Sequence, residues 1–156
     1  MSVIQNHQVN ILVVDPDERS RKQIHAILME DGYATRAVGT AKDAIRSAEE
    51  VAPNLLICDV NLGEQSGIAL FAELRAIADC PVVFISDSRL PETVDHARRA
   101  GATYFLGKPF DPTVLMELVD KALWMPHLVR RHVDSGAHRI KAPTFAPSAM
   151  RAGTAK

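Results

Sequence analysis

The sequence predicts an α/β fold in which helices cover both faces of a five-stranded parallel sheet, a doubly wound arrangement. Short apolar runs alternate along the chain with stretches of helical period, and this alternation occurs five times. The 47% hydrophobic and 24% charged content is ordinary for a globular protein, and 156 residues fit one domain. No apolar run approaches the roughly 20 residues that a membrane-spanning helix needs.

The strands are expected where β-branched and other apolar residues cluster between helical segments. The first and third runs each end in an acid, and the second alternates only weakly. The fourth begins with a proline, a position where the missing N–H matters least. The five expected strands cover residues 10–15, 33–38, 55–59, 81–86 and 103–107.

Each strand is followed by apolar residues at helical spacing and by a helix boundary signal. Gly32 and Gly101 are predicted to end the first and fourth helices, because glycine readily adopts the backbone found after a helix C-terminus. Thr40 begins a capping box for the second helix, and Asp111 caps the fifth. The expected helical positions are Ile24, Ile27 and Leu28; Ala44, Ile45, Ala48 and Val51; Leu70, Phe71, Leu74 and Ile77; residues 91–100; and Val114, Leu115, Leu118, Val119 and Leu123.

Charge divides the chain into an acidic body and a basic end. Residues 1–125 hold 12 basic and 18 acidic side chains, whereas residues 126–156 hold 6 basic and 1 acidic. We predict an N-terminal extension over 1–8, a domain over 9–124, and a flexible basic tail over 125–156. The tail lacks the structured patch and interleaved aromatic residues of a nucleic-acid site, so we do not expect it to bind nucleic acid.

The N-terminus and the cysteines predict a cytoplasmic location. The first ten residues lack a basic patch followed by a long apolar stretch, so neither a secretory signal nor a transit peptide is expected. Cys58 and Cys80 do not have the paired spacing of a zinc site, and we interpret both as small buried apolar residues.

Polar residues stand at the ends of four of the five strands. Asp15 ends the first and Asp59 the third; Ser86 ends the fourth, and Lys108 follows the fifth. Ligand sites of open parallel sheets lie at this edge. Neighbouring carboxylates repel unless a cation compensates them, and oxygen-rich sites with few protein ligands suit Mg²⁺. With a hydroxyl and an ammonium opposite, the pattern predicts a phosphoryl site whose carboxylate nucleophile forms an acyl phosphate.

In this order and spacing, the motifs resemble the receiver domains of bacterial two-component response regulators, of which the single-domain chemotaxis regulator is the simplest example. The resemblance covers residues 9–123 and implies the flavodoxin-like (βα)5 receiver fold. The motifs that carry it are the apolar run ending at Asp15, the segment 55–67 around Asp59, the strand 82–86, Gly101-Ala102, and Lys108-Pro109-Phe110.

The resemblance implies a role for each of four residues in accepting and reading a phosphoryl group. Asp59 matches the phosphoacceptor, and Lys108 the lysine that pairs with the phosphoryl oxygens. Ser86 matches the hydroxyl that swings toward them, and Phe105 the aromatic switch residue that follows it. The family also implies a cis peptide bond between Lys108 and Pro109. These roles describe a signalling module and not an enzyme.

The resemblance also implies a Mg²⁺ ion held by Asp15, Asp59 and the backbone carbonyl of Asn61. The family has a second acid directly after Asp15, but this chain has Pro16 there, which offers no ligating side chain. We therefore predict a raised Mg²⁺ requirement. Asp17 is an alternative ligand if the loop bends differently, although capping the following helix is the commoner role for such a residue.

Two further positions depart from the family pattern. Asp87 stands beside the hydroxyl, where the family prefers a small residue, and an acid there is expected to crowd and repel a phosphoryl group. Gly63 replaces a proline that many relatives have, and we expect it to loosen the loop after Asp59. Together with Pro16, these departures predict a receiver that is phosphorylated slowly or that works unphosphorylated.

Several functions follow from these features. The first is a receiver that takes its phosphoryl group from a histidine kinase or a phosphotransfer protein and then contacts an unidentified output protein through the fourth helix, fifth strand and fifth helix. The alternatives are a phosphorylation-independent interaction module and a DNA-binding regulator acting through its tail or a missing output domain. A flavodoxin-like mononucleotide binder is disfavoured by the acidic segment 15–18. A homodimer is a further possibility that the sequence leaves open.

Overall fold

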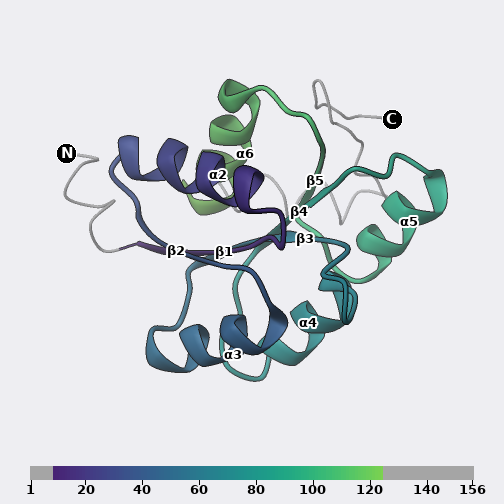
Figure 1. Ribbon diagram of the computed structural model, residues 1–156, viewed down its shortest axis with the longest axis horizontal. Coiled ribbons are helices and arrows are strands. Elements are labelled where there is room, and N and C mark those ends of the chain that lie inside the picture. The colour runs from purple at the N-terminus through teal and green to yellow at the C-terminus, as the bar shows by residue number, and fades with distance from the viewer. Residues whose placement is uncertain (1–8, 125–156) are drawn as a thin grey trace. The chain divides into compact units, whose positions relative to one another are not determined.

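The computed structural model describes residues 9–124, in which five strands alternate with five helices (Figure 1). The strands form one sheet in the order β2-β1-β3-β4-β5, and β1 pairs in parallel with β2 and β3, as β4 does with β5, which confirms the predicted doubly wound fold. The predicted extension over 1–8 and basic tail over 125–156 lie outside the described residues. The elements are β1 (Asn10–Val14), α2 (Glu18–Glu30), β2 (Ala34–Val38), α3 (Ala41–Glu50), β3 (Leu55–Asp59), α4 (Gly67–Leu74), β4 (Val82–Ser86), α5 (Pro91–Arg99), β5 (Tyr104–Gly107) and α6 (Pro112–Trp124).

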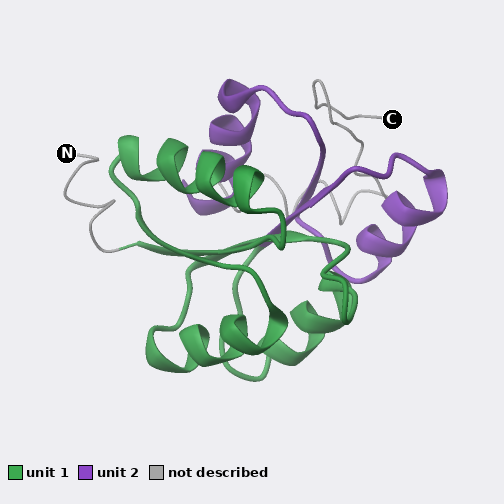
Figure 2. Ribbon diagram, in the orientation of Figure 1, with its two compact units in different colours: residues 1–81 green, residues 82–156 purple. Residues whose placement is uncertain are grey.

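The chain divides into two compact units, which Figure 2 shows in different colours. Unit 1 ends at Pro81 and contains β1 to β3 with α2, α3 and α4. Unit 2 begins at Val82 and contains β4, β5, α5 and α6. None of the helices in the described part of the chain is both long and apolar enough to cross a membrane.

Unit 1 is built around β1, which pairs with β2 on one side and β3 on the other. Helix α2 covers one face of these strands, and α3 and α4 cover the opposite face (Figure 1). Ile24 and Leu28 of α2 are fully buried, and all five residues of β3 are buried. A strand with both faces covered has no solvent side, which explains why β3 reads as a continuous apolar run.

The helix boundaries of unit 1 follow their capping residues, with one exception. The Thr40 hydroxyl accepts a hydrogen bond from the backbone N–H of Asp43, and Gly32 has a φ of 91°, as the helix ends require. Helix α4 stops at Leu74, short of the predicted Ile77. The N–H of Ile77 donates to the carbonyl of Leu74 over three residues, so the chain tightens there into turns.

Unit 2 pairs β4 with β5 in parallel, and α5 packs on β5 while α6 packs on β4. All residues of β4 are buried. Helix α5 begins at Pro91 and is followed by Gly101 with a φ of 103°. The Asp111 carboxylate accepts from the N–H of Thr113 at 2.8 Å, which confirms the predicted cap of α6.

Helix α4 starts closer to β3 than a side chain would permit. The N–H of Gly67 donates to the carbonyl of Val60 at 2.7 Å. A Cβ atom at Gly67 would lie 2.0 Å from the carbonyl oxygen of Asp59 and 2.9 Å from Sγ of Cys58. Glycine at this position is therefore what lets the helix approach the end of β3.

We expect Gly67→Ala to destabilise the protein by about 1–3 kcal/mol in urea unfolding, because backbone atoms of Asp59 cannot yield to the added methyl group. Helix propensity alone would change stability in the opposite direction, since alanine is favoured over glycine by about 1 kcal/mol. The exposed Ala69 of the same helix supplies the control, Ala69→Gly, which measures that propensity without a clash. A Gly67→Ala protein as stable as the parent, or more stable, would contradict the close approach.

Candidate functional site

The structure brings together the two acids predicted at the ends of the first and third strands. Val14 of β1 pairs with Cys58 of β3, and Asp15 and Asp59 directly follow these two residues. Asp15 is 0% exposed and Asp59 is 7% exposed, so water screens neither carboxyl group well. Both acids lie in unit 1, at the carboxyl ends of neighbouring strands, where parallel sheets form ligand sites.

The thiol of Cys58 lies beside this pair of acids, and the charges of both affect its pKa. Its Sγ contacts the carbonyl oxygen of Asp59 at 3.3 Å and is fully buried, as predicted. Burial raises the pKa of Cys58 well above its usual value, and the negative charges of Asp59 and Asp15 raise it further. Cys80 is half-buried instead, and burial next to Asp79 raises its pKa to about 11.

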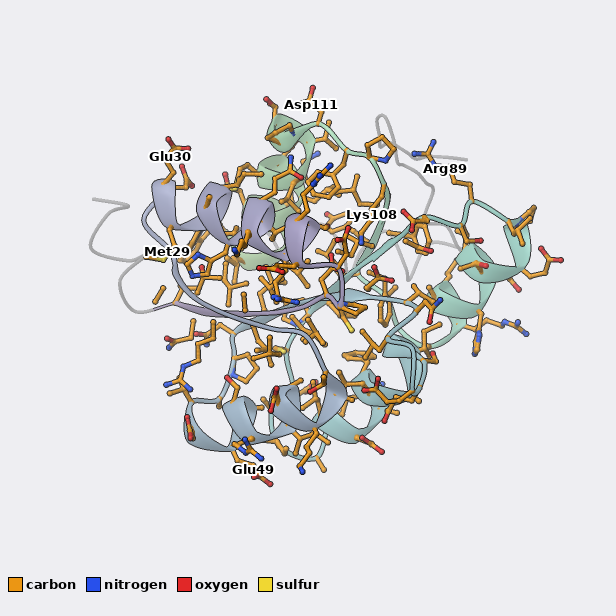
Figure 3. All side chains as sticks on the ribbon, in the orientation of Figure 1. Met29, Glu30, Glu49, Arg89, Lys108 and Asp111 are labelled. Atoms are coloured by element: carbon orange, nitrogen blue, oxygen red, sulfur yellow. The ribbon has the colours of Figure 1, made fainter. Side chains whose placement is uncertain are left out.

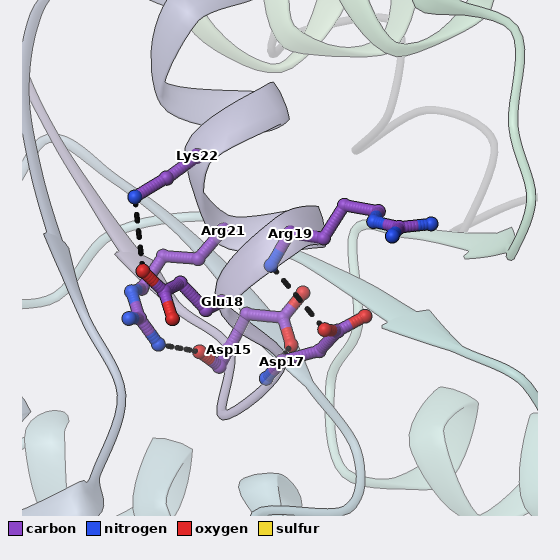
Figure 4. A network of polar contacts seen from close by, with 6 residues as sticks. All are labelled: Asp15, Asp17, Glu18, Arg19, Arg21 and Lys22. Carbon is purple, nitrogen blue, oxygen red and sulfur yellow. Dashed lines mark hydrogen bonds and ion pairs between the residues drawn. The ribbon is translucent and has the colours of Figure 1, made fainter.

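Hydrogen bonds that involve Asp15 and Asp17 stabilise the loop after β1 (Figure 4). The backbone N–H of Asp17 donates to Oδ1 of Asp15 at 3.0 Å, and Oδ1 of Asp17 accepts from the N–H of Arg19 at 3.3 Å. Asp17 is thereby the N-cap of α2. Nη1 of Arg21 donates to the backbone carbonyl of Asp15 at 2.9 Å, a contact that the sequence did not predict.

The acids of unit 1 have the chemistry of a Mg²⁺ site with few protein ligands. Mg²⁺ is commonly bound through one or two carboxylates and keeps several waters, and two adjacent buried carboxylates meet that requirement. No group of three or more His, Cys, Asp or Glu side chains suited to a metal occurs between residues 9 and 124. Asp15 and Asp59 are the two buried carboxylates among these residues, and the exposed Pro16 stands at the position of the second acid that the family resemblance implies.

The loop after β3 is ordered by its own hydrogen bonds. The N–H of Asn61 donates to Oδ1 of Asp59 at 2.8 Å, and the Asn61 side chain accepts from the N–H of Gly63 at 3.0 Å. Gly63 has a φ of 88°, which proline cannot adopt. Gly63 thus permits a turn that proline in its place would prevent, a role that the sequence did not indicate.

Glu64 ties the same loop to a second element of unit 1. Its Oε2 accepts a hydrogen bond at 3.0 Å from the backbone N–H of Ala41, the first residue of α3. This bond holds the pKa of Glu64 below its usual value. Glutamate next to a helix N-terminus is favourable, yet Glu64 stands 23 residues from that helix in the sequence and carried no signal of the contact.

In unit 2, the predicted hydroxyl and lysine lie on neighbouring strand ends. Ser86 pairs with Gly107, and the backbone N–H of Lys108 donates to the carbonyl of Ser86 at 2.8 Å. Ser86 is 4% exposed, and its Oγ accepts from the N–H of Ser88 at 2.9 Å. The peptide bond between Lys108 and Pro109 is cis, as the family resemblance implied.

Phe105 and Asp87 complete the predicted set in unit 2. Phe105 lies opposite Phe84 in the β4–β5 pairing and is half-buried, a position from which a side chain can reach both core and surface. Asp87 follows Ser86 directly and is exposed. Asp15, Asp17, Asp59 and Asn61 thus occupy unit 1, while Ser86, Asp87, Phe105 and Lys108 occupy unit 2.

Known proteins are similar to this chain over most of its length. The family model described as "Response regulator receiver domain" matches residues 11–120, which include every residue predicted for the site. The transcriptional regulatory protein ZraR of Salmonella typhimurium is 33% identical over 117 residues, which are 74% of this chain and 26% of ZraR. The chain therefore spans about a quarter of the length of this curated relative.

Solved structures give the same result. The receiver domain of NtrX from Brucella abortus is 34% identical and superposes with a TM-score of 0.68. The alignment covers 72% of this chain and 97% of that one. A response regulator of Burkholderia pseudomallei, solved with a phosphorylated aspartic acid, a calcium ion and citrate, is 23% identical with a TM-score of 0.67, covering 83% and 75%. By the extent of the family match and by its fold, the chain belongs to the response regulator receiver domains of two-component signalling systems.

Proposed function

We propose that this chain is a phospho-accepting receiver in which Asp59 takes a phosphoryl group from a phosphohistidine. The observation that carries the proposal is the buried pair Asp15 and Asp59 at adjacent strand ends, inside a segment that matches the receiver family. The Asn61 N–H bound to Oδ1 of Asp59 supports it, because this contact holds the carboxylate at a defined angle. A nucleophile held in place needs little reorganisation before reaction.

The transfer requires only one bond to form and one to break. An oxygen of the Asp59 carboxylate attacks the phosphorus atom, the P–N bond of the phosphohistidine breaks, and the electron pair returns to the imidazole. The product is an acyl phosphate on Asp59 and a histidine that regains its proton from solvent. Positioning and neutralisation of charge supply most of the catalysis in such transfers.

Ser86 and Lys108 are proposed to bind the oxygens of the transferred group, the first through its hydroxyl and the second through its ammonium. Both stand at strand ends of unit 2, and their backbones are hydrogen-bonded to each other. In this proposal Ser86 moves toward the phosphoryl group and Phe105 follows. The surface of α5, β5 and α6, next to which the N-cap residue Leu90 is 60% exposed, then presents a changed face to an output protein.

Receiver domains interact with histidine kinases and typically bind a divalent cation, and we propose both for this chain. The relative from Burkholderia pseudomallei combines a phosphorylated aspartic acid with a calcium ion. In this chain Asp15, Asp59 and the carbonyl of Asn61 would hold Mg²⁺, which when bound neutralises charge on the phosphoryl oxygens. Asp17 is the weaker candidate, since its carboxylate already caps α2.

A phosphorylation-independent interaction module is the second candidate. Two observations favour it: Pro16 replaces one acid of the site, and Asp87 places a charge directly after the hydroxyl. Both would slow phosphorylation without disturbing the fold. Labelling with a phosphodonor distinguishes the two candidates.

We expect the chain to gain about 80 Da, one phosphoryl group, when it is incubated with a small-molecule phosphodonor and Mg²⁺. Asp59→Asn should abolish this gain, because an amide cannot form the acyl phosphate. Intact-protein mass spectrometry measures both. Asp111→Asn is the matched control: it also removes a carboxylate, yet asparagine caps a helix as well as aspartate does.

Two results would contradict the receiver assignment. A wild-type chain that takes no label under any donor or Mg²⁺ concentration would favour the interaction module. Label that persists in Asp59→Asn would place the acceptor at another residue.

Restoring the missing acid with Pro16→Asp is expected to lower the Mg²⁺ concentration for half-maximal phosphorylation roughly tenfold, a gain of about 1.4 kcal/mol in binding. The physical reason is one more anionic group next to Asp15. Isothermal titration calorimetry of Mg²⁺ binding should show the same shift without relying on phosphorylation.

The control for this variant is Pro16→Ala, which removes the proline ring without adding a charge. Pro16 is exposed, so neither change disturbs packing. Equal Mg²⁺ affinity in the Asp and Ala variants would show that Pro16 does not weaken the metal site.

A further inference from the structure

The side chain of Arg89 lies against the backbone next to Lys108. Arg89 belongs to the loop between β4 and α5 and is exposed, yet its Nη2 donates to the carbonyl oxygen of Lys108 at 2.9 Å. Both residues are in unit 2 and are labelled in Figure 3. An exposed arginine loses side-chain entropy when it folds back onto a strand end, so the residues around it must favour this placement.

This contact is one of two hydrogen bonds that hold the backbone of Lys108. The N–H of Lys108 donates to the carbonyl of Ser86, and the carbonyl of Lys108 accepts from Arg89. Both backbone groups of Lys108 are thus bound by the same short segment, residues 86–90. Because the ammonium is carried on this backbone, the segment determines where the Lys108 side chain begins.

Gly107 provides the space that Arg89 occupies. A Cβ atom on Gly107 would lie 2.7 Å from Nε, 3.1 Å from Cζ and 3.2 Å from Nη2 of Arg89. Gly107 does not have a positive φ, so its backbone conformation does not require glycine. The three atoms nearest to that missing Cβ all belong to Arg89, which indicates that the glycine accommodates the guanidinium.

The loop that carries Arg89 is itself well ordered. Oγ of Ser86 accepts from the N–H of Ser88, and the Ser88 hydroxyl is hydrogen-bonded to that of Thr93 at 3.1 Å. The N–H of Leu90 also donates to Ser88 at 3.3 Å. Arg89 therefore extends from a segment fixed to both β4 and α5.

We infer that Arg89 is a positioning residue for Lys108: it holds the Lys108 carbonyl from the loop that also carries the Ser86 hydroxyl, so that hydroxyl and ammonium are set relative to each other. The inference rests on the proposed function, because positioning matters only if Lys108 binds a phosphoryl group. Arg89 itself touches no reacting atom.

A double-mutant cycle tests this role through the rate of phosphorylation by a small-molecule phosphodonor. Arg89→Ala is expected to lower the saturating rate roughly tenfold with little change in the KM for the donor. Gly107→Ala should lower it similarly, because its methyl group displaces the flexible end of Arg89 while the charge of Arg89 stays. The double variant should be no slower than either single variant, since both act through the same contact.

The inference would be wrong if Arg89 acted through its charge alone. In that case Gly107→Ala would match the wild type, Arg89→Lys would restore the rate, and the effect of Arg89→Ala would fall on KM and disappear at high salt. Arg98→Ala is the matched control, because it removes an exposed arginine of the same unit whose partner is Asp95. The control is expected to keep the wild-type rate.

Hydrogen exchange separates failure of this inference from failure of the proposed function. The amide of Lys108, which donates to Ser86, should exchange faster in Arg89→Ala and in Gly107→Ala. Faster exchange without any label in the wild type would contradict the phosphorylation chemistry. A labelled wild type with unchanged rate and exchange in Arg89→Ala would contradict the role of Arg89.

Discussion

Two carboxylates buried side by side are the interaction on which the rest of this molecule depends. Asp15 and Asp59 follow paired residues on neighbouring strands, and both are almost wholly removed from solvent. Such a pair is costly unless hydrogen bonds and positive charge oppose the repulsion. The N–H groups of Asp17 and Asn61 each donate to one carboxylate, and a bound cation would supply the positive charge. The loops after β1 and β3 can therefore be understood as supports for these two acids.

The sequence was sufficient for the fold and for the position of this pair. Buried parallel strands produce continuous apolar runs, and an acid at the end of such a run is conspicuous, so both Asp15 and Asp59 were expected at the carboxyl edge of the sheet. The pairing of β1 with β3, which makes them neighbours, comes from the structure. Glycines after helices were equally informative. The end of α4 could not be predicted in this way. Ile77 continues the apolar spacing of the helix, although hydrogen bonds over three residues have already ended the helix at Leu74.

Contacts between long side chains and distant backbone were beyond prediction. Arg89 meets the carbonyl of Lys108 19 residues away, and Glu64 meets the N–H of Ala41 23 residues away. Neither contact creates a periodic pattern, and arginine and glutamate on a surface loop are ordinarily solvated. Gly107 did not reveal the contact either, because a glycine at a strand end is as readily accounted for by a turn or a bulge. These loop contacts emerge only from the three-dimensional structure.

The buried thiol of Cys58 gives the molecule an internal reporter. Its Sγ faces the carbonyls of Asp59 and Gly67, at the junction where β3 meets the start of α4, and its raised pKa keeps it protonated and unreactive while that junction is closed. A thiol-reactive reagent can therefore modify Cys58 only when the junction opens. The rate of that modification in the folded protein therefore reports how often the segment that carries Asp59 opens, without any label having to be introduced.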